Sequence, residues 1–308
     1  MSKSRSFVAD YTVYLIVRLF VSVIQVLTID GSIAFADVLA WLAYRVDRRH
    51  RAVALENLRI AFGDRFSSAE RDDLVRSVYL HFCRLLIEII HLPRRMHITN
   101  WRDHLDLSTA RPFIACLLSD RPLLIVTGHF GNWEMGSYAL GLLGFPCHAV
   151  ARPLDNPYLD DFLRQFRERT GQKLLAKKGD FEQMQQILSG RGVLGTLADQ
   201  DAGKRGLFVD FFGRPASTHK AIALLALQYR VPLIVLLTRN LGKPLHCRVE
   251  VEDLILPEHY EGQPDAVRAV TQRFTAALER GVSRAPAQYF WLHRRWKHEP
   301  TRSSRRAA

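Results

Sequence analysis

The sequence has few cysteines, and no two of them lie close together. Four cysteines are spread over 308 residues. They form no CxxC motif and have no histidine at the spacing of a zinc co-ligand, which excludes a structural zinc site and a disulfide scaffold. Glycine (18) and proline (13) follow no period, so collagen-like and low-complexity chains are also excluded. We expect four reduced core thiols in a domain that faces the cytoplasm: Cys83, Cys116, Cys147 and Cys247.

Acidic residues are scarce relative to basic ones. The chain has 31 Asp and Glu against 43 Lys and Arg, a formal net charge of +12, and its sequence pI is near 9.9. With 48% hydrophobic and 24% charged residues it is otherwise an ordinary globular sequence. The charge excess predicts an anionic partner, which could be nucleic acid, a phospholipid surface or an acidic protein.

An apolar segment at residues 13–27 is the first candidate for a membrane contact. It is interrupted by Arg18, Ser22 and Gln25, which helical spacing places on one face, with Tyr14 one turn earlier. Because a charged arginine at the centre of a bilayer costs about 2.5–3.5 kcal/mol, a clean spanning helix is disfavoured. We therefore expect a shallow or packed membrane helix.

A secretory signal is the main alternative for this region, because residues 34–36 have the small-x-small form of a cleavage site. Arg18 breaks the hydrophobic region, however, and the apolar pattern resumes at residues 38–46, so we reject this alternative. A basic run follows at residues 47–51, and an anionic cytoplasmic leaflet would attract it. Two amphipathic helices that only pack on the body of the protein remain a second interpretation.

The rest of the chain predicts an α/β fold with a mixed central sheet flanked by helices. Ser67 and Glu70 have capping-box spacing and begin a long helix that ends near Pro93. Strands and helices then alternate, which is typical of a sheet with helices on both faces. The expected strands are residues 123–127, 148–151, 193–197, 233–238 and 245–251, and the expected helices are residues 133–143, 157–169, 181–188, 218–229 and 264–282, with a glycine-rich loop at residues 202–217.

This pattern divides the chain into three parts. N-terminal membrane-associated helices occupy residues 1–46, the main domain occupies residues 47–298, and a basic, disordered tail occupies residues 299–308.

The segment at residues 127–134 carries the most informative pattern. It follows an expected strand and leads into an expected helix, which is where open α/β sheets bind their ligands. Gly128 and Gly131 allow the chain to turn tightly around His129, and Asn132 is a good N-cap for the helix. The segment therefore predicts a functional loop that presents a histidine.

Glu134 lies in the first turn of that helix and forms a candidate acid–base pair with His129. A carboxylate bound to one imidazole nitrogen fixes the tautomer and leaves the other nitrogen free to take a proton from a hydroxyl group. The pair does not match the HExxH motif of zinc proteases, and no third ligand lies nearby, so no metal is expected. A lone histidine that caps a turn is the alternative interpretation.

The stretch HFGNWE at residues 129–134 resembles the HxxxxE catalytic motif of the late acyltransferases of lipid A biosynthesis, the lauroyl and myristoyl type. Further segments resemble this family in order along nearly the whole chain. They are Glu56-Asn57-Leu58, Arg152-Pro153 with Asn156, Asp199-Gln200-Asp201, Phe211-Phe212-Gly213 with Ala216-Ser217-Thr218, and residues 288–297. The resemblance implies a glycerolipid acyltransferase-like α/β fold behind the N-terminal helices.

The resemblance also implies a reaction. A fatty acyl chain would pass from an acyl thioester, carried by acyl-carrier protein or coenzyme A, to a hydroxyl of a lipid A precursor or related phosphorylated glycolipid. His129 would be the general base and Glu134 its orienting partner, with no covalent enzyme intermediate, no cofactor and no metal. The protein would act at the cytoplasmic face of the inner membrane, attached by its N-terminal segment as a single-pass or peripheral protein.

Further residues are expected to bind the substrates. Arg152 is suited to a phosphate, and Asp199 and Asp201 could position the saccharide or order arginine side chains. Backbone amides around Gly131 or the side chain of Arg152 are candidates for stabilising the oxyanion. The full expected binding set is Asn132, Arg152, Asp199, Gln200, Asp201, Phe211, Phe212, Thr218, Arg294 and Arg295.

Other functions stay open. The acceptor could be a phosphatidylinositol mannoside or a lysophospholipid, and the chain could instead be a non-catalytic basic membrane-binding protein, although the intact His129 and Glu134 argue against that. Nucleic-acid binding rests on charge alone, and no recognised nucleic-acid module is present. An acidic carrier, a phosphorylated lipid and an anionic leaflet account for the positive charge without nucleic acid.

Overall fold

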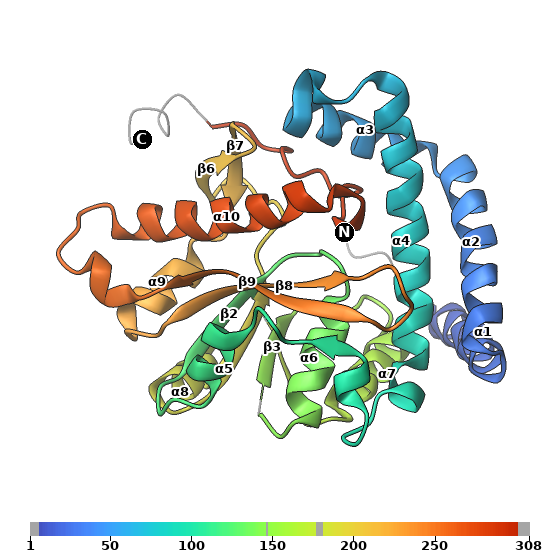
Figure 1. The fold of residues 1–308 in the computed structure, drawn as a ribbon, viewed down its shortest axis with the longest axis horizontal. Coiled ribbons are helices and arrows are strands. Elements are labelled where there is room, and N and C mark those ends of the chain that lie inside the picture. Colours follow the sequence, from blue (N-terminus) through green and yellow to red (C-terminus); the bar gives the residue numbers. More distant parts are fainter. Residues whose placement is uncertain (1–5, 146, 177–180, 301–308) are drawn as a thin grey trace.

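The computed structural model describes residues 6–145, 147–176 and 181–300 (Figure 1). Its α-helices are α1 (Phe7–Val26), α2 (Ile29–Val46), α3 (Arg48–Phe62), α4 (Ser68–Arg95), α5 (Arg111–Leu117), α6 (Trp133–Leu142), α7 (Pro157–Glu168), α8 (Phe181–Ser189), α9 (Ala221–Gln228) and α10 (Ala266–Arg284). Its 3-10 helices are η1 (Gly63–Arg65), η2 (Trp101–Asp103), η3 (Pro257–Tyr260) and η4 (Pro286–Gln288). Its strands are β1 (Leu105–Asp106), β2 (Leu123–Thr127), β3 (Cys147–Ala151), β4 (Lys173–Ala176), β5 (Val193–Leu197), β6 (Leu207–Phe211), β7 (Arg214–Thr218), β8 (Leu233–Asn240) and β9 (Cys247–Ile255).

A seven-stranded mixed sheet forms the centre of the molecule, in the order β1-β9-β8-β2-β5-β3-β4. The strands from β8 to β4 are all parallel, whereas β9 pairs antiparallel with β8 and parallel with β1. This confirms the expected α/β class with a mixed sheet. Because both faces of the parallel strands are apolar, helices must cover both.

Helices lie on the two faces as the alternating pattern predicted. One face packs on α5 and α6 through core side chains such as Phe113 and Met135. The other face packs on α8, α9 and α10 through Met184, Ile222 and Phe274. Figure 1 shows α10 above the sheet and α6 below it.

The N-terminal helices form a further layer beside the sheet. Helix α4 begins with the predicted capping box, in which the Ser67 amide donates to Glu70 (2.7 Å) and the Glu70 amide donates to the Ser67 hydroxyl (3.3 Å). It passes Pro93 in its last turn and ends at Arg95. Helices α1 and α2 lie beyond α4 at the outer edge of the molecule in Figure 1.

Among the described helices, α1 is long and apolar enough to cross a membrane, with a mean hydropathy of 1.8 over its 18-residue window and only 6% of that window buried. The division of the chain into residues 1–46 and 47–298 stays a prediction. Of the expected disordered tail, residues 301–308 lie outside the described residues. All four cysteines are free thiols, but only Cys147 and Cys247 are buried, whereas Cys83 and Cys116, also expected in the core, are half-buried.

Residues 202–217, expected to be a glycine-rich loop, instead contain most of a β-hairpin. Strands β6 and β7 pair through a two-residue turn at Phe212 and Gly213, whose φ angles are 54° and 68°. Positive φ at both turn positions is the type I′ geometry that suits a hairpin. The helix expected from Thr218 is also wrong in its start, because Thr218 ends β7 and α9 begins at Ala221.

Candidate active site

The loop that carries His129 lies between β2 and α6 and is held by close backbone contacts. Gly131 has φ +56°, and a Cβ built on it would lie 1.9 Å from the carbonyl oxygen of Thr238. The Gly131 amide donates to the Gln288 carbonyl (3.0 Å), and the Asn132 amide donates to the Thr238 carbonyl (2.8 Å). The sequence therefore needs glycine at residue 131 both for the backbone angle and for the approach of β8.

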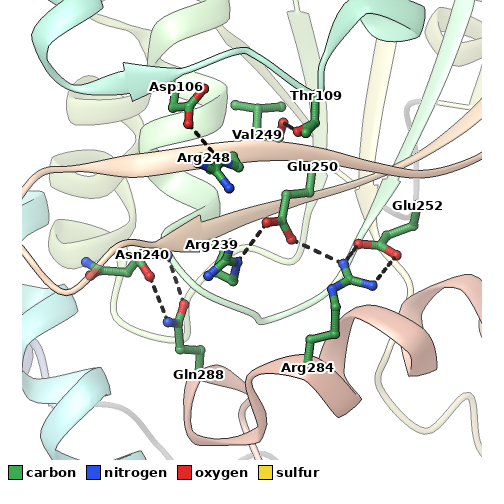
Figure 2. Close-up of polar contacts among 10 residues, drawn as sticks. All are labelled: Asp106, Thr109, Arg239, Asn240, Arg248, Val249, Glu250, Glu252, Arg284 and Gln288. Carbon is green, nitrogen blue, oxygen red and sulfur yellow. Dashed lines mark hydrogen bonds and ion pairs between the residues drawn. The ribbon is translucent and has the colours of Figure 1, made fainter.

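The C-terminal segment holds the same loop from the other side. Gln288 and Asn240 exchange two hydrogen bonds of 2.9 Å, from the Asn240 amide to Gln288 Oε1 and from Gln288 Nε2 to the Asn240 carbonyl (Figure 2). The Phe290 amide donates to the His129 carbonyl (3.0 Å). Figure 2 also shows Arg284 of α10 paired with two carboxylates of β9, which fixes the helix that leads into this segment.

His129 is hydrogen-bonded to Asp199 through both its ring and its backbone. Its ring nitrogen Nδ1 lies 2.9 Å from Asp199 Oδ1, and its backbone amide donates to Asp199 Oδ2 (2.8 Å). The two residues meet because β2 and β5 are parallel neighbours in which Thr127 pairs with Leu197. His129 and Asp199 each lie two residues beyond this pair. Asp199 is only 5% exposed, and with an ionised carboxylate on Nδ1 the proton of a neutral imidazole lies on that nitrogen and leaves Nε2 as an acceptor.

The pKa of His129 is raised. Burial of the imidazole by itself lowers this pKa, but the negative charge of Asp199 and its hydrogen bond outweigh the effect of burial, with a smaller contribution from the charge of Glu134. The pKa of Asp199 is lowered, because the charge and hydrogen bonds of His129 outweigh the strong opposing effect of burial. The site therefore contains a histidine whose protonated form is stabilised by a buried carboxylate.

Glu134 has a different partner from the one expected. Its carboxylate accepts from Nε (3.0 Å) and Nη2 of Arg167 on α7, and from the indole nitrogen of Trp133 (3.2 Å). The expectation that Glu134 orients His129 by a hydrogen bond is thus corrected, because Asp199 makes that contact. Glu134 lies in the first turn of α6, whereas His129 lies in the preceding loop, and the carboxylate of Glu134 is directed toward Arg167 of α7.

A cavity of about 1000 Å³ opens beside these groups. Its polar lining includes His129, Glu134 and Arg167, whereas most of its wall is apolar. Successive residues of β2 point to opposite faces of the sheet, and both Leu124 and Ile125 line the cavity. The cavity therefore reaches both faces, and its volume and lining suit a long hydrocarbon chain next to a polar group of side chains. Apolar wall residues include Phe113, Ile114, Leu140, Met184, Leu194 and Ile222.

Two of the expected binding residues also line this cavity, Arg152 and Gln200. The side chain of Arg152 is 84% exposed and lies 3.6 Å from Asp155, so it is placed at the mouth. The other expected binding residues are outside the lining. These are Asn132, Asp199, Asp201, Phe211, Phe212, Thr218, Arg294 and Arg295.

Several of these residues have structural partners. Arg295 is buried and donates to the Ser217 carbonyl (2.6 Å) and the Thr218 hydroxyl (2.7 Å), so it fixes β7. Asp201 pairs with His298 (2.7 Å). Phe211 lies in the core, Phe212 packs against that core from the hairpin turn, and Arg294 is exposed.

Asn132 caps α6 and is held by a residue that the sequence pattern did not reveal. Its side-chain oxygen accepts from the Met135 amide (2.9 Å), and its Nδ2 donates to Glu88 of α4 (2.8 Å). Glu88 also accepts from Nδ2 of Asn240 (3.0 Å). Burial raises the pKa of Glu88 against the lowering effect of these hydrogen bonds. The only signal in the sequence was an acidic residue within an apolar helix.

The backbone amides considered as oxyanion donors already have acceptors. The amides of residues 129–132 donate to Asp199, Gly128, Gln288 and Thr238, respectively. Arg167, whose guanidinium lines the cavity beside Glu134, is instead a side-chain donor within the site. Among the described residues, no group of three or more His, Cys, Asp or Glu side chains is arranged to hold a metal ion.

Comparison with known proteins places these residues in a family context. A family described as "Bacterial lipid A biosynthesis acyltransferase" matches residues 2–298. The lipid A biosynthesis lauroyltransferase of Escherichia coli (strain K12) is 27% identical over 267 residues, covering 85% of this chain and 84% of the relative. The lipid A biosynthesis palmitoleoyltransferase of the same strain is 24% identical over 271 residues (83% and 82%). A phosphatidylinositol mannoside acyltransferase of Mycolicibacterium smegmatis is 25% identical over 232 residues, covering 73% of each chain.

Proposed function

The chain belongs to the bacterial lipid A biosynthesis acyltransferase family and is an O-acyltransferase, and on that premise we propose that it transfers a fatty acyl chain from acyl-carrier protein to a hydroxyl of a lipid A precursor. The observation that carries the mechanism is the hydrogen bond between Nδ1 of His129 and buried Asp199 at the edge of the apolar cavity. His129 is the general base, and Asp199 is its positioning residue.

The reaction needs one proton relay. The acceptor hydroxyl oxygen attacks the thioester carbonyl carbon while its proton passes to Nε2 of His129. Collapse of the tetrahedral intermediate breaks the C–S bond, and Nε2 returns the proton to the departing thiolate. Asp199 stabilises the imidazolium that exists between the two transfers, in the way that a buried carboxylate does in a catalytic triad.

Arg167 stabilises the oxyanion in this proposal. Its guanidinium lies in the cavity wall and is fixed by Glu134, so a cationic donor is already in place where charge develops, which is usually a large catalytic effect. Burial alone lowers the pKa of Arg167, but the hydrogen bond and charge of Glu134 outweigh burial and raise it. Glu134 therefore acts mainly through Arg167, and its charge makes only a smaller contribution to the pKa of His129.

The apolar wall of the cavity and the positive net charge of the chain indicate the kinds of substrate. The apolar cavity takes the acyl chain, and Arg152 at its mouth meets a phosphate of the acceptor or of the carrier's prosthetic group. The formal charge of +12 suits an acidic carrier protein and an anionic leaflet. The reaction takes place at the cytoplasmic face of the inner membrane.

A second acceptor is supported by one comparison. The relative from Mycolicibacterium smegmatis is a phosphatidylinositol mannoside acyltransferase, so this chain could acylate a mannoside hydroxyl with the same catalytic groups. The two acceptors differ in the headgroup that reaches the cavity mouth, not in the proton relay.

The test is transfer by the purified protein in phospholipid vesicles. Acyl-carrier protein loaded with a labelled acyl chain would be mixed with a lipid A precursor or with a phosphatidylinositol mannoside, and the products identified by mass spectrometry. We expect an acylated lipid A precursor and none with His129→Ala. Acylation of the mannoside alone would show that the acceptor is the mannoside and not the lipid A precursor. Transfer by His129→Ala at the wild-type rate would refute the mechanism.

A further inference from the structure

Helix α1 is held against the body of the protein along most of its length. In its first half, the carbonyl of Asp10 accepts from Nδ2 of Asn156 (2.8 Å), at the start of α7. At its end, the Gln25 carbonyl accepts from Nη1 of Arg94 on α4 (2.7 Å). These contacts are 15 residues apart, which is about 22 Å of a helix about 30 Å long.

Aromatic side chains fill the contact between α1 and α7. The ring of Tyr158 lies 5.2 Å from that of Tyr11 and 5.8 Å from that of Tyr14. Arg18, the charge that interrupts the apolar segment, donates to the Tyr14 hydroxyl (3.2 Å), and its guanidinium lies 5.0 Å from the ring of Phe162. The arginine is thus directed to α7 and away from the lipid-facing side of α1.

A spanning α1 would carry α7 into the bilayer with it. Helix α7 exposes the charged residues Asp161 and Glu168 and is followed by exposed Arg169, and each would cost about 2.5–3.5 kcal/mol at the centre of the hydrocarbon. A helix that lies in the plane of the interface keeps all the contacts with α7 and α4 and exposes one side to lipid. The packing therefore favours the in-plane arrangement.

The free side of α1 continues into α2. Apolar residues of α1 remain exposed over a broad side of the helix, including Leu15, Leu19 and Val23. Phe20 and Phe35 connect the two helices, with ring centroids 6.1 Å apart. In Figure 1, α1 is seen nearly end-on and α2 side-on at the same outer edge, so both axes run parallel to one surface of the molecule.

Helix α2 supplies the second half of this surface and its basic rim. Val38 is 64% exposed and Trp41 is 55% exposed, and the guanidinium of Arg45 lies 3.8 Å from the ring of Trp41. Arg48 and Arg49 follow at the start of α3 and are exposed. A tryptophan beside arginines at the end of an apolar face is the pattern of a bilayer interface with anionic headgroups.

We propose that α1 and α2 together form a monotopic surface that lies in one anionic phospholipid leaflet, with α1 parallel to the membrane and the N-terminus on the same side as the catalytic domain. The proposal does not depend on the catalytic residues, so it stands or fails separately from the acyl-transfer mechanism.

The decisive measurement is the side of the membrane on which the N-terminus lies. The full chain with an N-terminal epitope tag would be treated with protease in spheroplasts and in inverted inner-membrane vesicles. We expect the tag and the catalytic domain to be protected in spheroplasts and both to be accessible in inverted vesicles. A tag cleaved in spheroplasts while the catalytic domain stays protected would establish a spanning helix and overturn the proposal.

The contribution of α2 is tested by matched substitutions in the full chain. Val38→Asp removes an exposed apolar side chain from the proposed surface, and Leu224→Asp does the same on α9, where Leu224 is 43% exposed. We expect Val38→Asp to weaken binding to vesicles of phosphatidylglycerol and phosphatidylethanolamine by about tenfold or more, and Leu224→Asp to bind as wild type. Equal binding by both variants would refute a lipid contact by α2.

Trp41 provides a readout that does not depend on binding strength. Brominated lipids quench a tryptophan at the depth of an interfacial helix, about 5–10 Å below the headgroups. We expect quenching of the part of the fluorescence that Trp41→Phe removes. If that part is not quenched and the protein forms dimers on vesicles, a second copy of the chain covers α2 and the proposal is wrong.

Discussion

Replacing Asp199 with asparagine tests the proposed relay at its least exposed member. The carboxylate accepts two hydrogen bonds from His129, one from Nδ1 (2.9 Å) and one from the backbone amide (2.8 Å). An asparagine of the same shape has one acceptor oxygen and one NH₂ group, so it cannot accept both. One of the two contacts becomes a donor facing a donor, unless Nδ1 loses its proton and the imidazole takes the wrong tautomer.

The size of the loss follows from these contacts. A hydrogen bond to a charged group contributes about 1.5–3 kcal/mol, and of the two contacts the one to Nδ1 stabilises the imidazolium of the transition state directly. Because asparagine keeps one of the two contacts, the expected loss is about 1.5–3 kcal/mol, which is a decrease of about 10- to 10²-fold in kcat. We expect binding of the acyl donor to be unchanged, because Asp199 lies behind His129 and outside the cavity lining.

The pH dependence of kcat/KM gives a second, independent test of the Asp199 assignment. In the proposed relay His129 must be neutral to accept a proton, and the pKa of His129 is raised above its ordinary value of 6.5 against the effect of burial, by the charge of Asp199. The kcat/KM of the wild type should therefore rise with pH through a pKa above 6.5. In Asp199→Asn that charge is lost and burial lowers the pKa, so the acid limb should move to lower pH.

The assay is acyl transfer from loaded carrier protein, with thermal unfolding measured in parallel. Asp73→Asn is the matched control, because its side chain is 79% exposed on α4 and it removes the same charge. We expect this control to keep wild-type kcat and pH profile. A folded Asp199→Asn variant that retains kcat within about threefold, or an acid limb that does not move, would refute the assignment.

Three further predictions follow from the same site. Glu134→Gln should lower kcat by about tenfold or more through disorder of Arg167 while moving the acid limb less than Asp199→Asn does; an equal or larger shift would mean that Glu134 acts mainly on His129. Gly131→Ala should lower the free energy of unfolding by about 2–5 kcal/mol, because it adds a backbone clash to an unfavourable φ, whereas Gly144→Ala, with φ +85° and open space, should cost about 1–2 kcal/mol; equal melting temperatures would contradict this. Because the folded pKa of His129 is raised, the stability difference between wild type and His129→Gln should be largest below about pH 6.5 and should be lost as pH rises through the folded pKa, as urea unfolding at several pH values would measure.

Local sequence patterns were sufficient to predict much of the fold and the position of His129 in the site. The run at residues 123–127 is apolar and short, so it predicts a buried strand whatever surrounds it, and the capping box at Ser67 predicts the start of α4 from two side chains. His129 could be singled out because glycines, a strand and a helix cap surround it within eight residues. Such signals depend on neighbours in the sequence, and the sequence contains them directly.

The partners of His129 could not be found in that way. Asp199 reaches it only because β5 is placed next to β2 in the sheet, and the order of strands is a property of the whole fold. Arg167, the partner of Glu134, lies in an amphipathic helix, where a basic side chain is ordinarily exposed to solvent. The β6–β7 hairpin was missed because its glycines suggested a loop, although Phe212 and Gly213 supply the turn that the pairing needs.

The hydrogen bonds from the His129 loop to Gln288 and Phe290 determine how late in synthesis the site can form. The His129 loop leaves the ribosome about 160 residues before Gln288 and Phe290, yet its Gly131 amide and His129 carbonyl bond to those late residues. Contacts so distant in sequence close last and slow folding. A nascent chain therefore carries the side chains of the proposed relay without the geometry to use them, and the enzyme cannot act on its acceptor until Gln288 and Phe290 have been synthesised and packed.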